Sequence, residues 1–175
     1  MAPVTNPLSL ADTLRAARDT RHLEIGPRAL GEVPRVFREQ FGARPGIIVA
    51  DANTFAAAGQ AVQDAFQAAS NPVLERFVFR DPDMHAEHRF VTEIEAVLKR
   101  REAIPVAVGS GTINDLTKLA AHRAGRPYLC VATAASMDGY TAFGASITLE
   151  GSKQTFECPA PKAVVADLGV IGAAP

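Results

Sequence analysis

The sequence predicts an α/β domain in which a mostly parallel sheet carries helices on both faces. Short apolar runs alternate with longer stretches of helical periodicity, which is typical of parallel strands joined by crossover helices. Several of these runs end in a carboxylate or in glycines, at the points where such sheets bind ligands. The 175 residues suffice for one buried core, so we expect a single domain over residues 1–175.

Composition argues against several classes of function. The formal net charge of −1 creates no overall field for nucleic acid or anionic lipid, and stacking on single strands is disfavoured with no Trp and two Tyr. No apolar run reaches the roughly 20 residues that span a bilayer, and the first residues lack the pattern of a leader peptide. Cys130 and Cys158 lack metal-site spacing, so we expect free thiols and a cytoplasmic protein.

The first half of the chain predicts helix and strand in alternation. Residues 12–41 carry charges on a helical period that is broken near residues 26–27. Residues 45–51 predict a buried strand ending in a carboxylate, and Asn53 is a suitable N-cap for an alanine-rich helix over residues 54–69.

Two further strands with one helix between them follow. Residues 76–79 predict a strand, and residues 85–101 predict an amphipathic helix whose apolar side is formed by Phe90, Ile94, Val97 and Leu98. Residues 103–108 are apolar throughout, which predicts a central strand buried on both faces.

The last third predicts one helix, two strands and a long polar loop. Residues 113–122 predict a helix closed by Gly125. Residues 128–132 and 163–166 predict strands, with no helix after the second one. Between them, residues 134–157 are rich in Gly, Ser and Thr and predict an active-site loop with a short hairpin.

A glycine-rich turn follows the central strand at Gly109-Ser110-Gly111-Thr112. Glycines allow the backbone to approach a phosphate, and the start of the next helix offers free N–H groups. The segment is not the dinucleotide fingerprint, because position 114 is Asn, and it lacks the Lys of a P-loop. A tight turn without a ligand remains the alternative.

Polar residues also follow three other strands. The loop over residues 133–141 contains hydroxyls and a carboxylate, and Asp51 and Asp167 each end an apolar run. Taken singly, each is equally compatible with a cap or turn that satisfies its own backbone. Because the carboxyl ends of parallel strands share one edge of a sheet, four such ends together predict a ligand site.

The histidines carry a weaker signal. His85 and His88 are three residues apart and could share a metal on a helix, but their charged surroundings favour a solvated face. His122, in a last helical turn, fits an interaction with the negative end of the helix.

Three segments together resemble a known enzyme family. Residues 109–118 (GSGTINDLTK), 133–141 (TAASMDGYT) and 161–167 (PKAVVAD) are similar to the sn-glycerol-1-phosphate dehydrogenases, most closely their bacterial branch. That family belongs to the superfamily of iron-containing alcohol dehydrogenases, glycerol dehydrogenase and dehydroquinate synthase. The resemblance covers nearly the whole chain and implies a Rossmann-like domain.

The resemblance implies a role for each matching residue. NAD or NADP would be held by the first strand-end aspartate, the glycine turn with its helix start, and the following polar loop, namely Asp51, Gly109, Gly111, Thr112, Ile113, Asn114, Asp115, Thr133, Ala134, Ala135 and Ser136. Asp138 and Asp167 would be catalytic and contact substrate, and Lys153 would contact the substrate phosphate. Asp167 would also be a ligand of a divalent metal such as zinc, nickel or iron, which polarises the substrate oxygen during hydride transfer.

Two departures from the family pattern limit these implications. Ala142 stands where the family often has serine. The family also continues into a helical second domain with two histidine metal ligands, and one carboxylate is not a metal site. We therefore expect this chain to be the NAD(P)-binding N-terminal domain, with the helical domain missing, and to be inactive alone.

The implied activity is reduction of dihydroxyacetone phosphate to sn-glycerol 1-phosphate. The expected partner is thus a small polyol phosphate, without nucleic acid or membrane insertion, and a homo-oligomer is compatible with the sequence. Three alternatives remain open at this point: a glycerol dehydrogenase-like enzyme, a dehydroquinate synthase-like enzyme, and a non-catalytic nucleotide-binding module.

Overall fold

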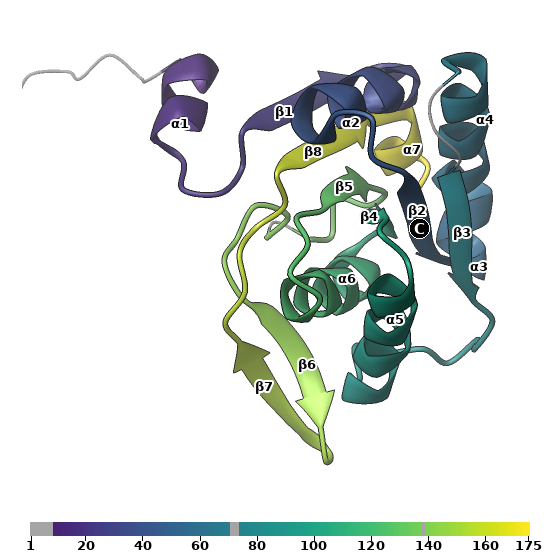
Figure 1. The fold of residues 1–175 in the computed structure, drawn as a ribbon, viewed down its shortest axis with the longest axis vertical. Helices are drawn as coiled ribbons and strands as arrows, with labels where there is room; N and C mark the ends of the chain where they lie inside the picture. Colours follow the sequence, from purple (N-terminus) through teal and green to yellow (C-terminus); the bar gives the residue numbers. More distant parts are fainter. Residues whose placement is uncertain (1–8, 71–73, 138) are drawn as a thin grey trace, which may run out of the picture.

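The computed structural model describes residues 9–70, 74–137 and 139–175, which build one six-stranded sheet, a separate hairpin and the helices around them (Figure 1). The sheet contains β1 (His22–Gly26), β2 (Gly46–Asp51), β3 (Leu74–Phe79), β4 (Ile104–Gly109), β5 (Leu129–Ala132) and β8 (Ala163–Asp167). The other elements are α1 (Leu10–Ala16), η1 (Ala29–Glu32), α2 (Val33–Phe41), α3 (Ala52–Thr54), η2 (Phe55–Gly59), α4 (Gln60–Ala68), α5 (His88–Arg100), α6 (Gly111–Arg123), β6 (Ala145–Leu149), β7 (Ser152–Phe156) and α7 (Leu168–Gly172).

All paired strands of the sheet run parallel, in the order β1–β8–β5–β4–β2–β3. Side chains alternate along each strand, so neighbouring residues enter opposite cores. In β2, for example, Ile47 joins one buried cluster and Ile48 the other. The expected Rossmann-like architecture is confirmed.

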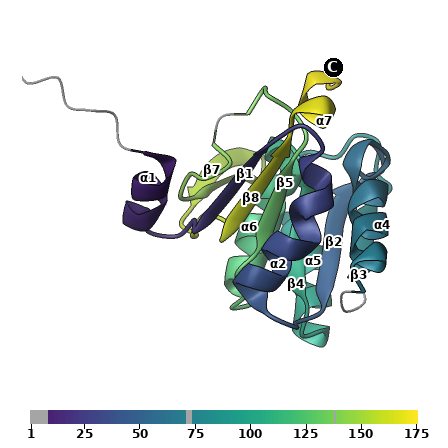
Figure 2. The same cartoon turned by 90° about the horizontal axis from the view of Figure 1, so that it is seen from above.

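Helices cover both faces of the sheet, as Figure 2 shows from above. One core forms where α5 and α6 pack against the sheet, through residues such as Ile94 and Leu116. The opposite core forms under α2 and α4, where Phe37 meets Phe66 edge to face with ring centroids 5.3 Å apart. These two layers fix the positions of the strand ends.

The amino-terminal segment differs from the sequence-based prediction. Residues 12–41 are not a helix with one break, because β1 lies between α1 and α2. β1 is an edge strand paired only with β8, and its residue Glu24 contacts Arg35 at 2.9 Å. A charged residue inside a half-buried five-residue strand gives a pattern that is easily taken for a helical period.

Two helix ends were also predicted incorrectly. The N-cap after β2 is Asp51 and not Asn53: the Asp51 carboxylate accepts the N–H of Thr54 at 2.8 Å, and the Thr54 hydroxyl accepts the N–H of Asp51. After β8 the chain does form a helix, the short α7, capped by Asp167. In both places the strand-end carboxylate itself starts the helix.

The predicted hairpin is present as β6 and β7, which extend away from the sheet at the bottom of Figure 1. Its base is held by α6. The Lys118 side chain, 1% exposed, donates from Nζ to the carbonyl oxygens of Ala142 at 3.0 Å and Gly144 at 2.9 Å. This buried ammonium group anchors the loop that joins β5 to β6.

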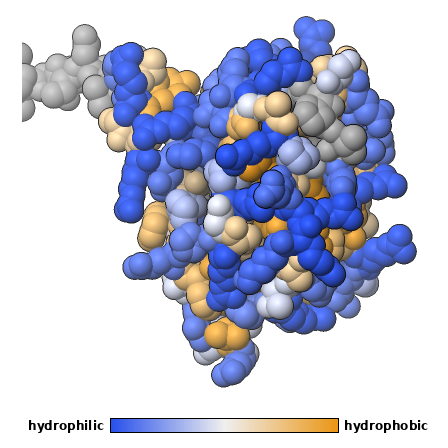
Figure 3. All heavy atoms as spheres, viewed as in Figure 1, coloured by the Kyte–Doolittle hydropathy of each residue, from blue (hydrophilic) through white to orange (hydrophobic). Residues whose placement is uncertain are grey.

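The surface in Figure 3 is mostly polar, with apolar residues in small groups. One such group lies on α1, where Leu10 is 54% exposed. Among the described residues, no helix is both long and apolar enough to cross a bilayer.

Candidate nucleotide-binding site

Four polar strand ends meet at the carboxyl edge of the sheet, as the sequence predicts. Gly109 pairs in register with Ala132, and Ala132 pairs with Ala166, so β4, β5 and β8 end at about the same level. Asp51 ends β2, the neighbour of β4. The glycine turn, the polar loop and the two aspartates therefore share one edge.

The glycine turn places α6 directly against the end of β4. A Cβ atom at Gly109 would lie 2.5 Å from Cβ of Ile113, too close for any residue other than glycine without moving the helix. A Cβ atom at Gly111 would meet only Sδ of Met137 at 3.5 Å, an ordinary contact. Gly109 is thus required for packing, whereas Gly111 leaves the helix start uncovered.

The start of α6 presents backbone donors to this edge. The first helical hydrogen bond runs from the N–H of Asn114 to the carbonyl of Ser110 at 2.9 Å. The N–H groups of Gly111, Thr112 and Ile113 precede it, and the Ser110 side chain does not cap them. Unpaired donors at the positive end of a helix dipole favour a bound anion such as a pyrophosphate.

Three side chains of the predicted cofactor set point elsewhere. Ile113 is buried, and Asn114 Oδ1 accepts the hydroxyl of Tyr128 at 3.0 Å. Asp115 Oδ2 accepts the N–H of Ser146 in the hairpin at 3.0 Å. These three side chains therefore support the fold and are not available to a ligand at the helix start.

The Asp115 carboxyl group lies in a buried polar cluster with Lys118, whose Nζ is 3.7 Å from Oδ1 of Asp115. Burial raises the pKa of Asp115, and the Ser146 N–H and the Lys118 charge lower it in part. Burial also raises the pKa of Cys130 to about 12, which keeps that thiol protonated. Both cysteines are free, as expected.

A cavity of about 420 Å³ opens along the shared edge. It is lined by residues that end or follow three strands, β2, β4 and β5, and by residues in and after α7: Asp51, Asn53, Thr54, Ala57, Ser110, Thr133, Ala134, Ser136, Val170, Ala173, Ala174 and Pro175. Thus the structure brings together Asp51, Thr133, Ala134 and Ser136 from the predicted set. Asn53, Thr54 and the α7 residues were not expected here, since their place depends on the helix starts described above.

A second cavity of about 270 Å³ adjoins the first on the side of β3. The two cavities have Asp51, Asn53 and Ser110 in common, and Thr112 lines the second one. Their junction at Ser110 lies beside the start of α6. An extended ligand with a central anionic group would therefore fit along both cavities, with that group at the helix start.

Tyr140 fixes the loop that follows β5. Its hydroxyl donates to the carbonyl of Ala134 at 2.9 Å and lies 3.4 Å from the Ala134 N–H. Burial raises the pKa of Tyr140, so the hydroxyl remains a donor at neutral pH. Thr133 is buried, whereas Ala135 is exposed and lines neither cavity.

Asp167 has both carboxylate oxygens engaged by backbone donors. Oδ2 accepts the N–H of Leu30 at 3.1 Å, and Oδ1 accepts the N–H of Gly169 at 2.9 Å, in a side chain that is almost fully buried. Within residues 9–70, 74–137 and 139–175, no group of three His, Cys, Asp or Glu side chains could hold a metal ion. The described residues therefore do not fit a metal ion, and the role of Asp167 as a metal ligand stays a prediction.

The remaining predicted residues are not at this edge, or cannot be placed. Lys153 lies on the exposed strand β7, opposite Thr148. Asp138 lies outside the described residues. His88 Nε2 is 2.7 Å from Nη1 of Arg123, so this histidine contacts a cation rather than forming a metal pair with His85.

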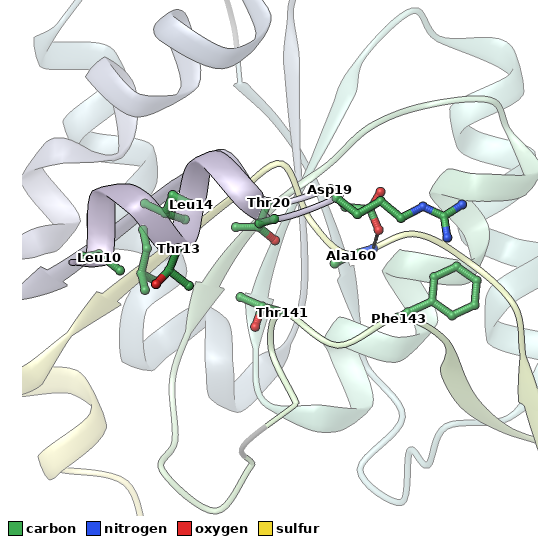
Figure 4. A pocket seen from close by; sticks show the side chains of 11 residues that line it. Leu10, Thr13, Leu14, Asp19, Thr20, Thr141, Phe143 and Ala160 are labelled. Atoms are coloured by element: carbon green, nitrogen blue, oxygen red, sulfur yellow. Dashed lines mark hydrogen bonds between the residues drawn. The ribbon is translucent and has the colours of Figure 1, made fainter. Parts of the chain in front are cut away.

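Another cavity, of about 320 Å³, lies between α1 and the loop near Phe143 (Figure 4). Leu10 and Leu14 line it from α1, and Thr141 and Phe143 line it from the loop between β5 and β6. None of the predicted cofactor, substrate or metal residues lines it, although Thr141 is the last residue of the 133–141 loop. The strand-end edge is therefore the stronger candidate site.

Comparison with known proteins shows the family of this chain. Residues 24–175 match the family model described as iron-containing alcohol dehydrogenase. The chain is 34% identical over 156 residues to glycerol-1-phosphate dehydrogenase [NAD(P)+] of Halalkalibacterium halodurans, covering 87% of this chain and 39% of the relative. It is 37% identical over 134 residues to the Bacillus subtilis enzyme of the same name, covering 74% and 33%.

The fold is shared with solved dehydrogenases. NADH-dependent butanol dehydrogenase A of Thermotoga maritima superimposes with a TM-score of 0.76 at 16% identity, covering 90% of this chain and 45% of that one. The chain spans about two fifths of the length of the first curated relative.

Proposed function

Because the chain belongs to the iron-containing alcohol dehydrogenase family, whose curated relatives are oxidoreductases, we propose that residues 1–175 form its NAD(P)-binding unit. The dinucleotide lies across the two adjoining cavities at the carboxyl edge of the sheet. The observation that carries this proposal is the uncapped start of α6 at the junction of those cavities. It supplies backbone donors where a pyrophosphate needs them.

The residues of this chain bind and orient the cofactor. The N–H groups at the α6 start hold the pyrophosphate, and Asp51 faces the adenosine ribose. Thr133 and Ser136 line the part of the cleft that receives the nicotinamide. When bound, the nicotinamide supplies the hydride. Tyr140 keeps the Thr133–Ser136 loop in place through the Ala134 backbone.

The proposed reaction is reduction of dihydroxyacetone phosphate to sn-glycerol 1-phosphate. Its support is the name of the curated relatives. Asp138 and Lys153 remain the proposed substrate contacts. No step is assigned to a metal ion, because both aspartates at this edge already accept backbone hydrogen bonds and no group of three His, Cys, Asp or Glu side chains among the described residues could hold a metal.

Titration with NADH tests the binding site directly. Gly111→Val places a branched side chain over the helix start, so we expect NADH affinity measured by calorimetry to fall at least tenfold, about 1.4 kcal/mol. Gly31→Val is the matched control, because a Cβ atom there meets nothing within 4 Å and Gly31 lines neither cavity. Unchanged affinity in Gly111→Val would show that the glycine segment is only a turn.

A further inference from the structure

A cationic side chain stands at the far end of the second cavity, beyond the strand-end aspartate. Asp51 pairs in register with Phe79, so Arg80 follows one residue past the level of Asp51 on the neighbouring strand. Both residues line the cavity of about 270 Å³, together with Ser110 and Thr112. Arg80 therefore faces the same space as the carboxylate that we place beside the adenosine ribose.

The charged residues that line this cavity differ in whether they have a partner within the structure. Asp81 lies 3.2 Å from Nη2 of Arg89, so its carboxylate already has a counter-ion. Asp51 uses one oxygen to accept the N–H of Thr54. Arg80 forms no ion pair with any residue that the structure describes, and its side chain is exposed. One guanidinium group is thus available to an anion bound in the cavity.

The anion that suits this position is a phosphate on the ribose. A guanidinium group presents paired N–H donors that match phosphate oxygens, and it stays charged at any physiological pH. In a dinucleotide whose pyrophosphate lies at the α6 start, the adenosine ribose reaches the ends of β2 and β3. A 2′-phosphate at that ribose would extend towards Arg80.

We infer that Arg80 is the residue through which this chain accepts the 2′-phosphate of NADP. The inference rests on the proposed function. Asp51 acts in the opposite direction, because its carboxylate favours a free 2′-hydroxyl and repels a phosphate. The two side chains together give a site that admits both NAD and NADP. The ratio of the two affinities then depends on how strongly Arg80 attracts the 2′-phosphate and how strongly Asp51 repels it.

The test measures dissociation constants by calorimetry for NADH, NADPH, ADP and 2′,5′-ADP. Arg80→Ala should weaken NADPH and 2′,5′-ADP at least tenfold and change NADH and ADP by less than twofold. Arg80→Lys should restore part of the lost affinity. Arg44→Ala is the matched control, because this exposed arginine precedes β2 at the opposite edge of the sheet. It should leave all four affinities within twofold.

Asp51→Asn provides the second arm, since asparagine can keep the helix cap while removing the charge. It should raise the affinity for NADPH relative to NADH. If the unaltered chain binds NADH but not NADPH, or if Arg80→Ala weakens both cofactors equally or neither, the inference is overturned while the proposed function stands. If the unaltered chain binds none of the four ligands, the proposed function itself fails. Thermal melting confirms that each variant is folded.

Discussion

Replacing the buried lysine of α6 should destabilise the protein far more than replacing a surface lysine. In Lys118→Met, two carbonyl oxygens at 3.0 and 2.9 Å lose their donor, and Asp115 loses the cation 3.7 Å away. Hydrogen bonds to charged groups contribute about 1.5–3 kcal/mol each. Methionine is easier to bury than an ammonium group, which offsets part of the loss. Removing one partner of a buried charge pair typically costs about 3–5 kcal/mol, and we expect that range here.

The measurement is urea unfolding followed by far-ultraviolet circular dichroism at pH 7. Lys99→Met is the matched control, because Lys99 is 62% exposed and pairs with Glu95 one turn earlier in α5. Such a surface pair contributes about 0.3–0.5 kcal/mol. If Lys118→Met lowers the free energy of unfolding by no more than the control does, the reasoning about the buried ammonium group is refuted.

Two further predictions concern carboxylates. Asp51→Ala removes the cap of the helix after β2 and should lower the free energy of unfolding by about 0.5–2 kcal/mol, whereas Asp51→Asn should be close to neutral. If urea unfolding shows that both variants lose the same free energy of unfolding, the capping role of Asp51 is contradicted. Because burial raises the pKa of Asp115 above its usual 3.8, the folded protein retains a proton there that the unfolded chain releases. This contribution to stability is present at low pH and is lost as pH rises through the raised pKa. Asp115→Asn should therefore make the free energy of unfolding depend less on pH in that range. If the slope of the unfolding free energy against pH is unchanged in the variant, the prediction is contradicted.

Much of the sheet could be predicted because its strands are buried on both faces. For an apolar run such as residues 104–108, few structures other than a buried strand are possible in a chain of this length. β1 was missed since it has a neighbour on one side only and tolerates Glu24 among its residues. Burial pattern alone does not distinguish such an edge strand from part of a helix.

The candidate site was predictable in position but not in side-chain direction. Parallel strands bring their carboxyl ends to one edge whatever their residues, so the convergence of Asp51, Gly109 and Thr133 follows from topology. The directions of Asn114 and Asp115 depend on Tyr128 and on the hairpin, which approach α6 only in the folded state. Arg80 was not singled out, because an arginine after a strand has no distinguishing pattern in the sequence.

The pairing of β1 with β8 joins the two ends of the described chain. His22 lies opposite Ala163, and the Asp167 carboxylate accepts the N–H of Leu30, 137 positions earlier. During synthesis on the ribosome, β1 therefore has no partner until nearly all of these residues have been made. β2, β3 and β4 can pair long before that. Contacts of such long sequence separation form late and slowly, so the last folding event on this route is the docking of the amino-terminal strand onto a sheet that is otherwise complete.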